Sequence, residues 1–279
     1  MATIDSHQHF WQFNPTRHDW ITDDMSVIQR DFLPSDLDPI LQKNNIDGCI
    51  SVQADQTEVE TDFLLKLADN HDFIKGVVGW VDLRADNIYE RLEHYSQFKG
   101  LKGFRHIVQG ETDTEFMLRP KFKNGITELK LYDFTYDILI YHDQLAQAIQ
   151  FVKLFPNQKF VLDHIGKPDI KSGEYALWQI NITKLALHQN VYCKISGMVT
   201  ESEWDDWKPS DFKIYLDTVV KAFGTERLMY GSDFPVCTLA ATYEAQLNIV
   251  TSYFSSFTNV EKRKIMGDNA SKFYGLNIV

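Results

Sequence analysis

Eight strand-like runs, most of them separated by a segment with helical periodicity, constrain the fold of this 279-residue chain more than any other feature. The runs cover residues 3–9, 48–53, 74–81, 101–107, 134–141, 160–164, 191–195 and 227–230. Alternating strands and helices predict parallel strands covered by helices. Eight such units favour a closed (β/α)8 barrel, the TIM barrel, because an open doubly wound sheet more often stops at fewer strands. The predicted fold class is therefore α/β.

The segments between the runs carry further signals. Thr57 and Glu60 have the spacing of a helix capping box, and an apolar stripe at helical spacing follows them. Two connections are longer than the rest, residues 10–45 and 111–131. Both follow the C-terminal end of a predicted strand, where barrel enzymes carry their substrate-binding loops. We therefore expect both to shape a pocket, with the aromatic run that includes Trp11 as part of its wall.

Composition limits the organisation and the partners of the chain. No Gly-, Pro- or Ser-rich linker and no repeat interrupts it, so we expect one domain over residues 1–279. Its 28 Lys and Arg against 39 Asp and Glu give a formal net charge of -11, and the cations are scattered. Nucleic acids and anionic membranes are therefore poor partners, because binding to phosphate depends on neutralisation by Lys and Arg.

Three cysteines, Cys49, Cys193 and Cys237, lie in or beside apolar segments, which favours buried, reduced thiols. The N-terminal residues lack the basic and apolar regions of a signal peptide. No window approaches the ~18 apolar residues of a membrane helix. These features predict a cytoplasmic protein, and they leave its oligomeric state open as monomer or homo-oligomer.

His7 and His9 end the first predicted strand. Residues two apart in a strand project to the same face, so we expect both imidazoles to point into the mouth of the barrel. There they can hold one cation or polarise one carbonyl oxygen. A lone histidine is more often a hydrogen-bonded core residue, but a pair at this spacing favours a functional site.

Asp233 follows the last predicted strand, in the segment G-S-D-F-P. Closure of the barrel would bring it beside His7 and His9, where a carboxylate can take a proton from water or ligate a metal. A turn aspartate is the structural alternative. His164 ends the sixth predicted strand, where a third imidazole can complete a metal site or act as an acid. Asp163 next to it is expected to point the opposite way and to be structural.

Strand parity also selects candidate substrate contacts. In the seventh strand, Lys194 is predicted to face the lumen, where a lysine is costly to desolvate unless it meets an anionic group. A substrate contact is one interpretation, and a buried ion pair to Asp233 or Asp137 is the other. Arg105 and His106 end the fourth strand, and only one of them faces inward if the strand is regular. Arg105 suits a forked contact to carboxylate or hydroxyl groups.

The chain lacks the motifs of zinc proteases, serine hydrolases and nucleotide-binding proteins. Several of its segments together resemble the amidohydrolase superfamily, of the amidohydrolase-2 type. They are D-S-H-Q-H-F-W at 5–11, G-F-R-H at 103–106, V-L-D-H-I-G-K-P at 161–168, C-K-I-S-G at 193–197, M-Y-G-S-D-F-P at 229–235 and G-D-N-A with F-Y-G within 267–275. The segments run in order along the whole chain, which makes the resemblance more specific than any single motif. Within the superfamily the chain looks like the sugar-lactonase branch, which includes L-fuconolactonase-like and L-rhamnonolactonase-like enzymes and pyrone-dicarboxylate lactonase.

The resemblance implies a hydrolase of carbohydrate metabolism that opens a sugar lactone, a cyclic ester. The catalytic residues that it implies are His7, His9, His164 and Asp233, and the candidate substrate contacts are Arg105, Lys194, Trp11 and Tyr136. The expected reaction is attack by water on the lactone carbonyl, with Asp233 taking the proton. A metal-dependent decarboxylase or amidase on the same barrel is an alternative, and a non-catalytic barrel that binds a small molecule is another.

The metal content also has two alternatives. Superfamily members with two metal ions carry a bridging lysine or glutamate and a further histidine, which this chain lacks. The sequence therefore leaves open a reaction that needs no cofactor and a site with one divalent ion such as zinc. The ligands of that ion would be His7, His9 and Asp233, with His164 nearby.

Overall fold

The computed structural model describes residues 2–276; residues 1 and 277–279 of the expected domain lie outside this range. Its eight parallel strands neighbour one another in chain order. They are β1 (Ile4–Gln8), β2 (Gly48–Val52), β3 (Ile74–Gly79), β4 (Leu101–Ile107), β5 (Thr135–Leu139), β6 (Phe160–Leu162), β7 (Val191–Ile195) and β8 (Leu228–Tyr230). A parallel bridge between Gln8 and Phe234 and further β1–β8 contacts join the two edges into a nearly closed barrel. The predicted (β/α)8 fold is confirmed.

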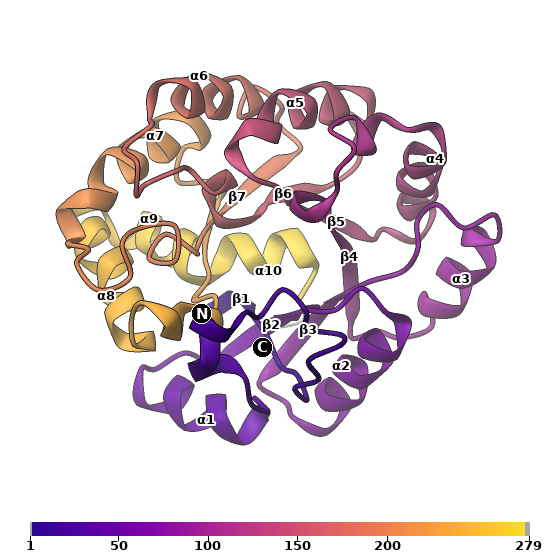
Figure 1. Cartoon of the computed structure of the whole chain (residues 1–279), viewed down its shortest axis with the longest axis horizontal. Helices are drawn as coiled ribbons and strands as arrows, with labels where there is room; N and C mark the ends of the chain where they lie inside the picture. The colour runs from indigo at the N-terminus through magenta and orange to yellow at the C-terminus, as the bar shows by residue number, and fades with distance from the viewer. Residues whose placement is uncertain (1, 277–279) are drawn as a thin grey trace.

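Most of the helices form a ring outside the strands, and the last one, α10, lies across the centre of this view (Figure 1). The helices are α1 (Pro34–Lys43), α2 (Glu58–Asn70), α3 (Ile88–Tyr95), α4 (Pro120–Leu129), α5 (Leu145–Leu154), α6 (Ala176–Leu185), α7 (Lys213–Phe223), α8 (Tyr243–Tyr253), α9 (Asn259–Arg263) and α10 (Asn269–Tyr274). The two long connections each contain a covering helix, α1 and α4, in addition to a loop. Among the described helices, none is both long enough and apolar enough to cross a membrane.

Two apolar layers position the site. Cys193 and Ile195 belong to the layer between strands and helices, whereas Lys194 between them faces the lumen, as strand parity predicts. A smaller apolar cluster fills the lumen and packs against the last helix, α10. The strand residues of this cluster are Ile4, Ile50, Val52, Val78, Val161 and Met229. In Figure 1, α10 lies across the centre of the ring, and its apolar side chains cover one end of the barrel. The polar residues of the candidate site lie at the other end.

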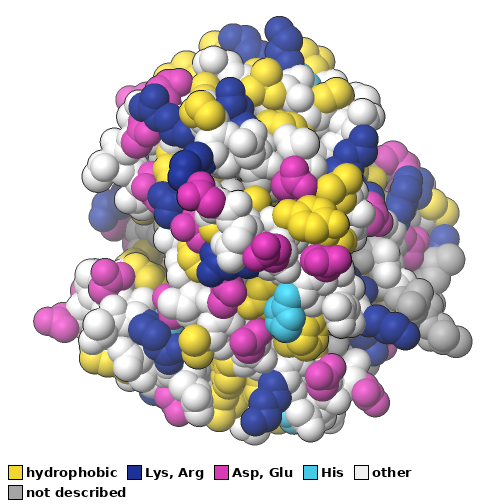
Figure 2. All heavy atoms as spheres, turned by 90° about the vertical axis from the view of Figure 1, so that its right-hand side faces the viewer, with side chains coloured by type: hydrophobic (Ala, Val, Ile, Leu, Met, Phe, Trp, Pro, Cys, Tyr) yellow, Lys and Arg dark blue, Asp and Glu magenta, His cyan; other side chains and the backbone are white. Residues whose placement is uncertain are grey.

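The surface carries charges of both signs. Figure 2 shows one face, on which Lys and Arg are interspersed with Asp and Glu and hydrophobic side chains form only small groups. Cys49, Cys193 and Cys237 are buried and free, as predicted.

Candidate active site

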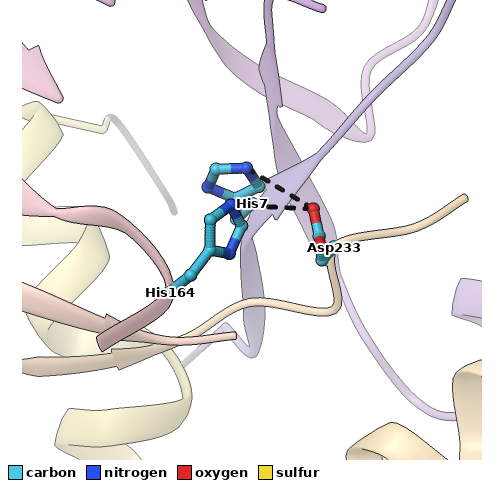
Figure 3. Close-up of side chains that lie close together, drawn as sticks. All are labelled: His7, His164 and Asp233. Atoms are coloured by element: carbon cyan, nitrogen blue, oxygen red, sulfur yellow. Dashed lines mark ion pairs between the residues drawn. The ribbon is translucent and has the colours of Figure 1, made fainter. Parts of the chain in front are cut away.

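Four of the predicted site residues meet at one end of the barrel. His9 Nε2 lies 3.3 Å from both His7 Nε2 and Asp233 Oδ1. Asp233 Oδ1 also lies 3.8 Å from His7 Nε2 and 3.9 Å from His164 Nε2. Figure 3 shows the His7 and His164 rings together, 4.4 Å apart at their centroids, with both facing that carboxylate. The structure therefore brings three imidazoles onto one carboxylate.

The backbone fixes Asp233 against the first strand. The Asp233 N–H donates to the carbonyl oxygen of His7 at 2.8 Å, and the His9 N–H donates to the carbonyl oxygen of Phe234 at 2.7 Å. Asp233 itself has a φ of 60°, a left-handed conformation that aspartate and asparagine tolerate better than most residues. These two backbone bonds hold the carboxylate and the histidine pair at their close distance.

His164 lies just beyond the end of β6, in a left-handed turn. Its φ is 53°, and its Nδ1 lies 2.9 Å from Ser196 Oγ, which follows β7. The ring packs directly over Gly197, where a Cβ would come within 2.6 Å of His164 Nδ1. Only glycine leaves room for the imidazole, and Gly197 also has a positive φ, of 63°. The C-K-I-S-G segment thus both supports His164 and makes space for it.

The prediction that Asp163 points away from the site is wrong. Asp163 Oδ1 lies 3.3 Å from His7 Nδ1 and 3.0 Å from Lys194 Nζ, while Arg105 Nη1 donates to Oδ2 at 3.0 Å. Val161, two residues before Asp163, faces the lumen, so the alternation of side chains along β6 itself points Asp163 inward. The left-handed turn at His164 then breaks this alternation and brings His164 inward as well. Both Asp163 and its neighbour therefore face the centre of the barrel.

Lys194 does not contact the pocket, contrary to its expected role in substrate binding. Its ammonium lies 2.5 Å from Asp137 Oδ2, 3.0 Å from Asp163 Oδ1 and 3.1 Å from His7 Nδ1, and the side chain is fully buried. The alternative interpretation, a buried ion pair with Asp137, describes the structure. Three protein groups surround the three N–H donors of the ammonium, so none remains for a ligand.

Tyr136 and Trp11 are not among the residues that line the pocket either. Tyr136 faces the helix layer, where it packs against aromatic rings such as Phe122 and Phe151. Trp11 is almost fully buried and donates from Nε1 to the carbonyl oxygen of Arg30. Trp20, from the same aromatic run, does line the pocket.

Arg105, rather than His106, faces the site. Its guanidinium contacts Asp163 and also donates to the side chain and the carbonyl oxygen of Gln53. His106 points to the other side of β4, where its ring stacks on Phe116 at 4.6 Å between centroids. Successive side chains of a regular strand point to opposite faces, so only one of Arg105 and His106 can face inward, as predicted. That residue is Arg105.

A cavity of about 500 Å³ opens over these groups. His9, His164, Arg105 and Asp233 line it, whereas the fully buried His7 lies behind them. Its walls include Trp20 from the first long connection, Trp204 after β7, and the Lys167–Glu201 ion pair, at 3.3 Å. Of the second long connection, only Glu111 belongs to the wall.

Burial and charge set the protonation of the cluster. Burial lowers the pKa of His7 and of His164 well below the usual value, so both rings are neutral. Burial alone would raise the pKa of Asp233, but the adjacent His164 and His9 hold it below its usual value. Since Lys194 and Arg105 balance Asp137 and Asp163, Asp233 adds an unbalanced negative charge beside three imidazoles.

This donor set fits one divalent cation. His9 Nδ1 lies 2.7 Å from the carbonyl oxygen of Val52, which only accepts, so Nδ1 carries a proton and a neutral ring turns the Nε2 lone pair toward Asp233. Two ligands of a tetrahedral zinc ion are about 3.4 Å apart. The separations among His7 Nε2, His9 Nε2 and Asp233 Oδ1 are 3.3, 3.3 and 3.8 Å. His164 lies close enough to contribute a further ligand atom.

Two supporting residues were not predicted. Asp5 Oδ1 accepts from the N–H of Ser232 at 2.9 Å, while Tyr243 donates to Oδ2 at 3.0 Å, which ties β1 to the segment after β8. Glu60 accepts from the N–H of Ala54 in the pocket wall, at 2.5 Å. The sequence predicted that Glu60 forms a capping box with Thr57. Only the Thr57 side chain caps the helix, and the Glu60 carboxylate supports the pocket wall instead. No local pattern distinguishes Asp5 from an ordinary strand-end aspartate.

Comparisons with known proteins agree with this geometry. A family model described as Amidohydrolase matches residues 4–276. The chain is 38% identical to an L-fucono-1,5-lactonase of Burkholderia multivorans, over 98% of this chain and 96% of that protein. It is 25% identical to an L-rhamnono-gamma-lactonase of Scheffersomyces stipitis, over 65% and 61%. A crystal structure of a Burkholderia multivorans amidohydrolase with bound zinc is 37% identical and superimposes with a TM-score of 0.95, over 99% and 100%. These similarities confirm the resemblance seen in the sequence motifs: the chain belongs to the amidohydrolase family.

Proposed function

We propose that this protein hydrolyses a sugar lactone by directing water onto the lactone carbonyl. The observation that carries the proposal is the Asp233 carboxylate, which lines an open pocket 3.3 Å from His9 and within 4 Å of two further imidazoles. The related L-fucono-1,5-lactonase supports a lactone rather than the substrate of a decarboxylase or an amidase. Binding alone does not require a buried carboxylate surrounded by three imidazoles, whereas general-base hydrolysis uses such a group.

Asp233 is the general base in this proposal. It removes a proton from water as the water oxygen attacks the carbonyl carbon. Arg105 and His164, which line the pocket beside it, stabilise the negative charge that develops on the carbonyl oxygen. The bond between the carbonyl carbon and the ring oxygen then breaks, and Asp233 returns the proton to the ring oxygen. The product is the open-chain hydroxy acid.

We also propose that His7, His9 and Asp233 hold one divalent ion such as zinc. A bound ion supplies Lewis-acid polarisation of the carbonyl and lowers the pKa of a coordinated water. His7 can serve as a ligand from behind the pocket lining, because its Nε2 faces Asp233 and His9. The carbonyl of Val52 supports this arrangement by keeping the proton of His9 on Nδ1.

A panel of lactones tests the function. Six-membered 1,5-lactones and five-membered γ-lactones of deoxy and simple aldonic acids are mixed with the protein in a weakly buffered pH-indicator solution. Ring opening releases an acid, which the indicator reports. We expect turnover of at least one neutral sugar lactone. The 1,5-lactones are tested first, because the relative that is 38% identical to this chain is an L-fucono-1,5-lactonase. A complete lack of turnover across both ring sizes would contradict the proposal.

Removal of the metal should lower activity. We expect dialysis against a strong zinc chelator to reduce kcat by at least about 100-fold, and stoichiometric zinc to restore it, because the ion would supply the main electrophile. Metal content is measured by mass spectrometry on the same samples. Full activity in a protein shown to contain no metal would establish the cofactor-free alternative instead.

Trp20 is expected to contribute substrate binding rather than chemistry. Its indole lines the pocket wall and is held by a 3.1 Å hydrogen bond from Nε1 to the carbonyl oxygen of Ala54. We expect Trp20→Ala to raise KM about tenfold with kcat nearly unchanged, since the lost contact is the same in ground and transition states. Trp207→Ala is a matched control, because Trp207 makes a similar hydrogen bond to Ala240 but does not line the pocket. Equal effects of the two variants would refute the assignment.

A further inference from the structure

The segment after β4 presents one carboxylate to the pocket. Glu111 lines the wall, and its side chain is 27% exposed, so a ligand can reach it. A short turn at Val108–Gly110 leads to this residue and is closed by a 3.0 Å hydrogen bond from the Glu111 N–H to the carbonyl oxygen of Val108. That carbonyl also accepts from Gln144 Nε2 at 3.1 Å. Gln56 Oε1 accepts from the N–H of Ile107 at 2.8 Å. The backbone that carries Glu111 is therefore fixed to two neighbouring segments.

A buried histidine orients the Glu111 carboxylate. His106 Nε2 lies 2.7 Å from Glu111 Oε1, and on the other side of the ring Trp80 Nε1 donates to Nδ1 at 3.3 Å. An indole N–H only donates, so Nδ1 has the lone pair and Nε2 has the proton, which His106 donates to Glu111. Burial lowers the pKa of His106, and the ring stacks on Phe116. Glu111 Oε1 is thus held by a neutral partner and not by a cation.

The second oxygen of Glu111 is open to a ligand. Oε2 accepts no hydrogen bond from the residues that the structure describes. Arg105 and Lys167, the cations of the wall, each pair with another carboxylate. A carboxylate oxygen only accepts, so Oε2 suits a hydroxyl or another donor. A sugar lactone with its carbonyl at Asp233 must place its ring hydroxyls against the remaining walls, which include Glu111.

We infer that Glu111 determines specificity: its Oε2 accepts a hydrogen bond from one ring hydroxyl of the lactone, and the site therefore selects a polyhydroxylated ring over one that lacks this hydroxyl. The inference rests on the proposed function, whose substrate class it narrows. A hydrogen bond to a charged acceptor is stronger than one between neutral groups. A lactone without the hydroxyl would also take water away from Oε2 and leave that oxygen unpaired. Both effects favour binding of the hydroxylated substrate.

Lactams test this contact without turnover. A δ-lactam of a six-carbon sugar acid has the ring and the hydroxyls of the 1,5-lactone, but its amide bond is far less reactive than an ester. The series consists of the parent lactam and analogues that each lack one ring hydroxyl, and calorimetric titration measures Kd. We expect one analogue to bind the wild type about tenfold more weakly than the parent does. We expect Glu111→Gln to weaken binding of the parent by about the same factor, because the charged acceptor is lost.

The two changes should not add. The analogue without the contacted hydroxyl should bind Glu111→Gln with nearly the wild-type Kd, because the contact is already absent. Glu111→Ala repeats the comparison without an amide at this position. Glu115→Gln is the matched control, since it removes an exposed carboxylate from the same connection away from the pocket wall, and should leave every Kd unchanged.

Three results would overturn the inference. They are an equal loss of affinity for the parent and all analogues on substitution of Glu111, no loss for any of them, and a parent lactam that does not bind the wild type. The first would mean that Glu111 acts on the shape of the pocket and not through a hydroxyl.

Kinetics separates the two proposals. On the best lactone, Glu111→Gln should raise KM about tenfold with kcat nearly unchanged. A wild type that hydrolyses no lactone but shows the expected coupling with the lactams would reject the proposed function and keep the role of Glu111. Turnover of a sugar lactone without that coupling would reject the role of Glu111 and keep the proposed function.

Discussion

Asp233→Asn is expected to lower kcat by about 1000-fold or more while leaving the fold intact. The carboxylate is the only proposed base and also a proposed metal ligand, and loss of a general base alone costs 100- to 10,000-fold. The backbone should tolerate the change, because asparagine is among the few residues that adopt the left-handed conformation of Asp233. Steady-state kinetics on the best lactone, together with a melting curve, measures both effects.

Asp205→Asn is the control for this variant. It removes one negative charge from the exposed residue next to Trp204 at the pocket wall and should leave kcat unchanged. If Asp233→Asn kept more than about a tenth of the wild-type kcat, the carboxylate could not be the base, since even the weakest general bases contribute more.

The sequence predicted the site where two simple geometric rules apply. Residues two apart on a strand share a face, and this placed His7 and His9 together. The ends of a barrel close on each other, and this placed Asp233 beside them, although it is more than two hundred residues away in the chain. Strand parity likewise placed Lys194 in the lumen.

The rules fail where the backbone leaves the strand or where partners lie across the lumen. Asp163 has the inward parity of Val161, and His164 faces the site as well only because the left-handed turn ends the alternation, which nothing in the local pattern predicts. Parity gave Lys194 its direction but could not choose its partner, since Asp137 lies on another strand. Of the aromatic run expected in the pocket wall, Trp20 lines the pocket and Trp11 does not, because side-chain direction in an irregular loop has no period.

Lys194→Met is expected to cause the largest loss of stability of the substitutions considered. It leaves Asp137 and Asp163 fully buried without the cation that lies 2.5 and 3.0 Å from them. Removal of one partner of a buried ion pair typically costs about 3–5 kcal/mol, because the remaining charge stays desolvated. For a chain of this size the melting temperature should fall by on the order of 10 °C. Chemical denaturation measures the free energy of unfolding directly.

Two comparisons separate an uncompensated charge from the mere loss of a lysine. Lys213→Met breaks a surface ion pair with Asp217, in which the lysine side chain is 66% exposed, and should cost less than about 0.5 kcal/mol. Adding Asp137→Asn to Lys194→Met removes the buried negative charge that the first substitution leaves unpaired. The double variant should therefore be more stable than the single variant. Equal losses for Lys194→Met and Lys213→Met would mean that water or a rearranged side chain reaches the buried carboxylates. In that case the Lys194 ammonium would not be the group that stabilises the buried carboxylates of Asp137 and Asp163.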